Sequence, residues 1–123
     1  MFCYQCEQTA KGQGCDKLGV CGKTPETAAL QDLLLYVVKG LSQVAQAARE
    51  AGITDRETNV FTVQAVFSTL TNVNFDAGRF PGLIDRCVAL REKLKAALAA
   101  KGVAKTFDKA AGLIPARDLA ALV

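Results

Sequence analysis

The sequence predicts an all-α protein, a three-helix antiparallel bundle preceded by a cysteine-rich loop. Apolar residues recur every three or four positions in three segments, and capping or turn residues separate these segments. The first 23 residues instead contain four cysteines and four glycines without a helical period. With 123 residues, half of them apolar, we expect one domain: a loop over 1–23, a bundle over 24–102, and a short helical tail over 103–123.

The first helix is predicted to begin after Thr24, a good N-cap residue, with Pro25 and Glu26 in its first turn. It should end near Gly52. A wide apolar face runs along it and contains Leu30, Leu33, Leu34, Val37, Val38, Leu41, Val44, Ala45 and Ala48.

The second helix is predicted from a capping box at residues 54–57 to about Thr71. Its apolar row contains Val60, Val63, Val66, Phe67 and Leu70. The β-branched residues in this segment leave a strand as an alternative, but the residues do not alternate strictly, and this favours a helix.

The third helix is predicted from Phe80 to Gly102, with Cys87 on its apolar face as a buried core thiol. Beyond it, we expect a helical turn from Asp108 to Ala111 and the start of another helix over 117–123. The last five residues are apolar and lack a cap, which is typical of a fragment end.

The composition argues against several classes of function. Fifteen basic and twelve acidic residues give a net charge of +3, and the basic residues are scattered, so we expect no nucleic-acid partner. No apolar run approaches the roughly 20 residues that cross a bilayer, so we expect no membrane partner. The N-terminus does not resemble a signal peptide, and we expect a cytoplasmic protein.

Cys3, Cys6, Cys15 and Cys21 are the candidate metal ligands. A disulfide framework would spread its cysteines along the chain, whereas these four lie close together in one loop. Four thiolates suit an iron–sulfur cubane with one sulfur per iron, and they also suit tetrahedral zinc. Only the first gap is short, which favours iron–sulfur, with zinc and redox-active disulfides as alternatives. The chain has no histidine, so it lacks a histidine base.

Other residues of the loop suit such a cluster. Backbone amides that would donate to sulfur are those of Gly12, Gly14 and Gly22. Lysines that would offset its negative charge, if they are not simply solvated, are Lys11, Lys17 and Lys23. Phe2 and Tyr4 would either shield the cluster from water or anchor the loop on the bundle.

Residues 1–10, Gly14-Cys15 and 19–23 closely resemble the N-terminus of the hybrid cluster protein family, also called prismane protein or hydroxylamine reductase. The resemblance continues through residues 27–34 and the turn over 69–76. It implies that Cys3, Cys6, Cys15 and Cys21 bind the family's cubane. Their gaps match the compact form of the motif, which implies [4Fe–4S], whereas wider gaps accompany [2Fe–2S].

The chain also departs from the family. Family members are several times longer, and their further domains build a hybrid iron–sulfur–oxo cluster from a histidine, glutamates and additional cysteines. This chain has no histidine and only Cys87 beyond the motif. We therefore expect no catalytic residues here, although the parent family reduces hydroxylamine to ammonia and handles nitric oxide.

The resulting hypothesis is an N-terminal electron-relay domain of a hybrid cluster protein. Its expected partners are the remaining domains of the parent and a redox donor protein, and the fragment would self-associate through an exposed apolar face. The alternatives are a free-standing ferredoxin-like electron carrier and a structural metal-binding helical domain.

Overall fold

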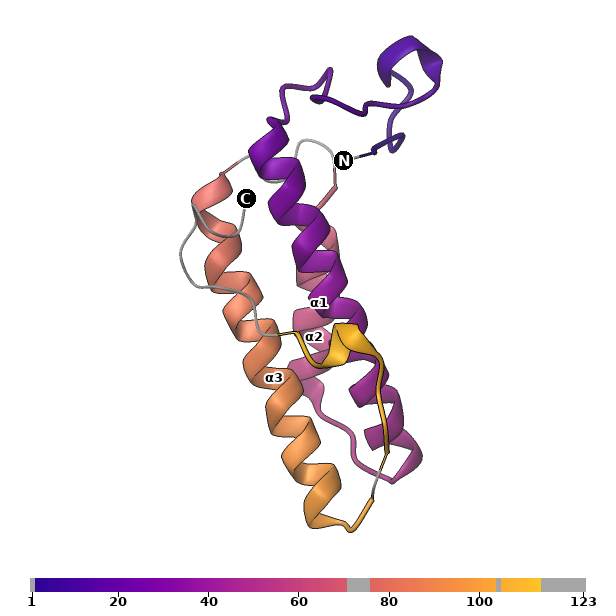
Figure 1. Ribbon diagram of the computed structural model, residues 1–123, viewed down its shortest axis with the longest axis vertical. Helices are drawn as coiled ribbons and strands as arrows, with labels where there is room; N and C mark the ends of the chain where they lie inside the picture. The colour runs from indigo at the N-terminus through magenta and orange to yellow at the C-terminus, as the bar shows by residue number, and fades with distance from the viewer. Residues whose placement is uncertain (1, 71–75, 104, 114–123) are drawn as a thin grey trace.

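The computed structural model describes residues 2–70, 76–103 and 105–113. Three α-helices dominate it: α1 (Pro25–Glu50), α2 (Arg56–Phe67) and α3 (Phe80–Ala100). Three short 3-10 turns accompany them: η1 (Ala10–Gly12), η2 (Ala77–Arg79) and η3 (Lys109–Ala111). Each helix runs opposite to the one before it along the long axis of the molecule (Figure 1). The predicted all-α bundle is confirmed.

The long helix α1 begins and ends as predicted. The Thr24 side chain accepts a hydrogen bond from the Thr27 amide at 3.2 Å, and Pro25 occupies the first turn. At the other end, Gly52 has a φ of 81°, and the Ile53 amide donates to the Ala48 carbonyl at 2.8 Å. A positive φ of this kind suits glycine, so the position of Gly52 explains where α1 stops.

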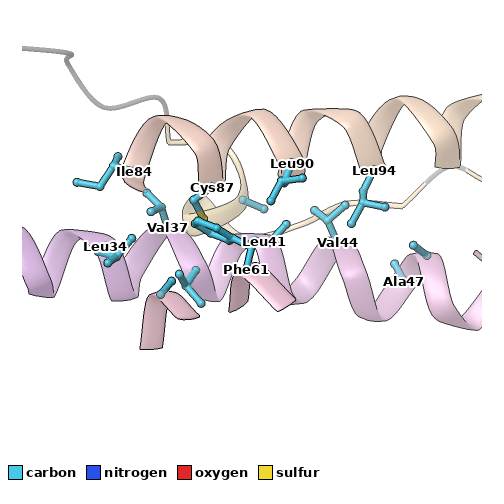
Figure 2. Close-up of a cluster of buried hydrophobic side chains, with 14 of the residues drawn as sticks. Leu34, Val37, Leu41, Val44, Ala47, Phe61, Ile84, Cys87, Leu90 and Leu94 are labelled. Carbon is cyan, nitrogen blue, oxygen red and sulfur yellow. The ribbon is translucent and has the colours of Figure 1, made fainter. Parts of the chain in front are cut away.

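The core lies mainly between α1 and α3 (Figure 2). Leu34, Val37, Leu41 and Val44 of α1 face Ile84, Leu90 and Leu94 of α3, and all of them are buried. Cys87 is fully buried in the same layer, beside Phe61 of α2. The prediction that Cys87 is a core thiol is confirmed.

Helix α2 differs from its prediction in three ways. It begins after Asp55, so the capping box that starts at Thr54 is wrong, and it ends at Phe67. Asp55 instead accepts a hydrogen bond from the Thr58 hydroxyl at 2.6 Å. The helix packs through Thr58, Phe61 and Ala65, whereas the apolar row that predicted it is exposed: Val60, Val63, Val66, Phe67 and Leu70.

The turn η3 packs against the middle of the bundle, in the region where a helical turn was predicted (Figure 1). A Cβ atom on Gly40 of α1 would lie 2.8 Å from the Ala111 nitrogen and closer still to the Ala110 carbonyl. From α3, the Arg91 guanidinium donates to the Leu113 carbonyl at 2.7 Å, and Lys95 donates to the Ala111 carbonyl. Glycine in α1 therefore permits close backbone contact with this turn. The helix predicted over 117–123 lies outside the described residues.

Candidate metal centre

The N-terminal loop extends beyond the start of α1, at one end of the molecule (Figure 1). A pair of backbone hydrogen bonds closes it: the Cys3 amide donates to the Cys15 carbonyl at 2.9 Å, and the Cys15 amide donates to the Cys3 carbonyl at 2.8 Å. The Thr9 hydroxyl also donates to the Cys3 carbonyl at 3.0 Å. These bonds bring two cysteines that are twelve residues apart into direct opposition.

All four predicted ligands line one small cavity. Its other lining residues are Gln5, Thr9, Gly19, Val20 and Lys23. The four thiols are free, and their exposure differs: Cys15 is buried, Cys3 and Cys6 are partly covered, and Cys21 is exposed. Two larger grooves, along α3 and between α1 and α2, are lined by no cysteine.

The cavity has a volume of about 10 Å³, close to the space that one water molecule needs. Among the described residues, no group of three or more cysteine or carboxylate side chains is arranged to hold a metal ion. Four free thiols around one cavity are nevertheless the donor set that an iron–sulfur cluster requires. The chemistry of the donor set therefore fits such a cluster.

Hydrogen bonds to sulfur favour the thiolate at Cys15. They lower its pKa, the largest effect coming from the Val20 backbone, followed by the Ala10 amide and the Thr9 side chain. The Ala10 nitrogen lies 3.4 Å from the Cys15 sulfur, and the Thr9 hydroxyl lies 3.6 Å from it. Because the thiolate is the form that binds metal, these donors prepare Cys15 to act as a ligand.

The predicted glycine donors are wrong. The Gly12, Gly14 and Gly22 amides donate to backbone carbonyls within the loop's own turns, at 2.9 to 3.2 Å. The backbone donors to the Cys15 sulfur are instead those of Val20 and Ala10. Which amides point toward sulfur depends on the fold of the loop, so the residue types alone could not identify them.

The three lysines of the loop differ in exposure, and its two aromatic residues lie at the surface. Lys11 and Lys17 are exposed, which matches solvated charges, whereas Lys23 is only 4% exposed. The Phe2 ring lies against Gly14, and the two aromatic rings are 5.5 Å apart. Both rings are mostly exposed, at 62% for Phe2 and 71% for Tyr4, so neither is buried against the bundle.

Comparison with known proteins identifies the family of this chain. The family model described as Prismane/CO dehydrogenase matches residues 1–119. The chain belongs to the Prismane/CO dehydrogenase family. The resemblance inferred from the cysteine motif is therefore confirmed.

Within the Prismane/CO dehydrogenase family, the chain is 61% identical over 124 residues to a hydroxylamine reductase of Syntrophobacter fumaroxidans. It is 57% identical over 124 residues to one of Methanocella arvoryzae and 55% identical over 98 residues to one of Microcystis aeruginosa. The alignments cover all of this chain in the first two cases and 80% in the third. They cover 23%, 23% and 18% of those relatives, so the chain spans less than a quarter of their length.

Proposed function

We propose that this chain is the N-terminal electron-relay domain of a hydroxylamine reductase of the hybrid cluster type. The observation that supports the proposal most strongly is that Cys3, Cys6, Cys15 and Cys21 line one cavity. Membership of the Prismane/CO dehydrogenase family supports an iron–sulfur cofactor. By resemblance to the compact form of the hybrid cluster motif, the spacing of the four cysteines implies a [4Fe–4S] cluster.

The bound cluster would accept and donate single electrons. The chain's own residues would bind it, orient it and tune its charge. Cys15 would bind as a thiolate that the Ala10 amide stabilises, and the paired backbone of Cys3 and Cys15 would fix two ligands relative to each other.

The chemistry on hydroxylamine would belong to other parts of a longer polypeptide. The hydroxylamine reductases that the chain matches extend well beyond the aligned region. Here the fifth cysteine, Cys87, is fully buried between helices, where it is not available as a cluster ligand. We therefore expect the remaining domains and a redox donor protein as partners. Among the described residues, none of the helices has the length and apolar character of a membrane span.

Counting metal and sulfide after anaerobic reconstitution tests the proposal. We expect about four irons and four sulfides per chain, the content of one cubane. Cys15→Ser should remove or convert the cluster, whereas Cys87→Ala, the matched control, should retain it. About one zinc per chain without sulfide would overturn the proposal.

A redox titration of the reconstituted protein then addresses its role. Reversible reduction within the range of iron–sulfur proteins would support an electron relay. A cluster that resists reduction throughout this range would support the structural alternative instead.

A further inference from the structure

Lys23 is a buried lysine in the wall of the cysteine cavity. Only 4% of the residue is exposed, and it lines the same cavity as the four thiols. None of the ion pairs between described residues includes it. Most of the Lys23 side chain is therefore covered by the loop, which is uncommon for a lysine.

The turn over residues 19–23 places Lys23 beside a candidate ligand. The Gly19 amide donates to the Lys23 carbonyl at 2.8 Å, and the Gly22 amide donates to the Gly19 carbonyl at 2.9 Å. A Cβ atom on Gly19 would lie 2.8 Å from the Lys23 Cβ and 3.0 Å from the Cys21 sulfur. Lys23 and the Cys21 sulfur therefore approach Gly19 from the same side, and any larger residue there would push them apart.

A cubane with four thiolates has a formal charge of about −2 when oxidised, and one added electron makes it more negative by one unit. A nearby positive charge stabilises the more negative state, and it does so most strongly where water is excluded. We propose that Lys23 supplies this compensating charge and raises the reduction potential of the cluster. This inference rests on the proposed function.

Lys23→Met tests the role because it removes the charge and keeps an unbranched side chain of similar length. In an anaerobic redox titration of the reconstituted protein, we expect its potential to be lower than that of the wild type. The expected change is at least tenfold in the one-electron equilibrium constant, which corresponds to about 59 mV. Lys17→Met, at an exposed lysine of the same loop, should cause a much smaller change, because water screens the charge.

Lys23→Arg distinguishes charge from shape, since arginine keeps the charge. A potential close to that of the wild type in Lys23→Arg would support the proposal. If Lys23→Met cannot hold the cluster, retention of the cluster in Lys23→Arg would likewise support a role of the positive charge. Loss of the cluster in both variants would overturn the inference.

A fully loaded Lys23→Met with the potential of the wild type would also overturn the inference, while leaving the proposed function intact. By contrast, a wild-type protein that binds no iron and sulfide would contradict the proposed function itself.

Discussion

Two cysteines of this chain have thiols in opposite surroundings. At Cys15, hydrogen bonds from the Val20 and Ala10 backbone and from Thr9 lower the pKa of the thiol. At Cys87, burial raises the pKa to about 12, and the nearby charge of Arg91 opposes this only in part. The first surroundings favour the thiolate, which is the form of cysteine that binds metals, and the second keep a neutral thiol that serves only in packing.

This contrast predicts the pattern of alkylation. In the metal-free protein at mildly alkaline pH, iodoacetamide should modify the exposed Cys21 and leave Cys87 unmodified, because Cys87 is fully buried and protonated. Mass spectrometry of the digested protein measures the extent of alkylation at Cys21 and at Cys87. Addition of denaturant should make Cys87 reactive. Equal rates at Cys21 and Cys87 in the native protein would show that the core opens far more readily than its packing indicates.

Asp55 should make stability depend on pH in the acid range. The Thr58 hydroxyl lowers the pKa of the Asp55 carboxyl most strongly, and Lys93 also lowers it. A carboxyl with a depressed pKa in the folded state stabilises the protein above its unfolded-state pKa, and this stabilisation is lost as the pH falls through the folded-state pKa.

Asp55→Asn should therefore reduce the free energy of unfolding at neutral pH by about 1 kcal/mol, because a hydrogen bond to a charged acceptor contributes more than one to a neutral amide. The difference between variant and wild type should shrink on acidification below the ordinary range of aspartate, because protonation removes the same charge from the wild type. Urea unfolding at several pH values measures it. If the difference in the free energy of unfolding stays constant even where Asp55 is protonated, the effect would come from the shape of the side chain and not from its charge.

At the scale of elements, the contact between α1 and η3 depends on a residue without a side chain. A methyl group on Gly40 would collide with the backbone of Ala110 and Ala111. Gly40→Ala should destabilise the fold by about 1–3 kcal/mol, the usual cost of overpacking, even though alanine favours helices.

Gly82→Ala in α3 is the matched control. A Cβ atom there would meet no atom within 4 Å, so helix propensity alone should act, and the variant should be as stable as the wild type or slightly more stable. Thermal unfolding of both variants, followed by circular dichroism, measures the difference. Equal melting temperatures for the two would contradict close packing of η3 on α1.

The helices themselves could be predicted because their signals are local. Thr24 and Pro25 determine the start of α1, and Gly52 marks its end. The face of α2 could not be predicted, because two sides of that helix carry apolar residues and periodicity does not say which one meets α1. The side that packs contains Thr58 and Ala65, which a hydrophobic pattern ranks below the exposed valines.

For the candidate site, the sequence likewise predicted the ligands but not their surroundings. The four cysteines stand out by number and spacing, and they do line one cavity. The donors to sulfur and the special position of Lys23 could not be predicted. They depend on how the loop turns, and three loop lysines of one type look alike in a sequence.

At the scale of the whole molecule, the loop has little core of its own. Its described link to the end of α2 is a hydrogen bond from the Gln5 side chain to the Thr69 carbonyl at 3.5 Å. Binding a cluster should therefore order the loop, while the helices depend on the separate core between α1 and α3.

Hydrogen exchange with and without the cluster tests this separation. Loss of the cluster should sharply reduce protection of the amides in residues 2–23, and protection in α1 and α3 should change little. Limited proteolysis should likewise cut the loop first. Equal protection of the loop in both states would show that the metal does not contribute to its order.

The exposed row of α2 predicts association. Val63 is 70% exposed and Phe67 is 58% exposed on a helix that has no neighbour on that side among the described residues. We expect the isolated chain to self-associate through this row, because contiguous exposed apolar side chains are unfavourable in water. Val63→Lys combined with Phe67→Lys should yield a monomer in analytical ultracentrifugation, whereas Tyr36→Lys, at an exposed residue of α1, should not. A monomeric wild type at high concentration would contradict the expectation.

The four thiols differ in exposure, so one edge of the candidate site faces solvent and the opposite edge is covered. Cys15 is buried and Cys21 is exposed, so a molecule arriving from solvent meets the Cys21 edge first. With the proposed cluster bound, a docked redox protein would have its shortest path to the metal through this edge. Dissolved oxygen would reach the cluster at the same edge, so the exposure that suits electron entry would also leave the cluster open to attack by air.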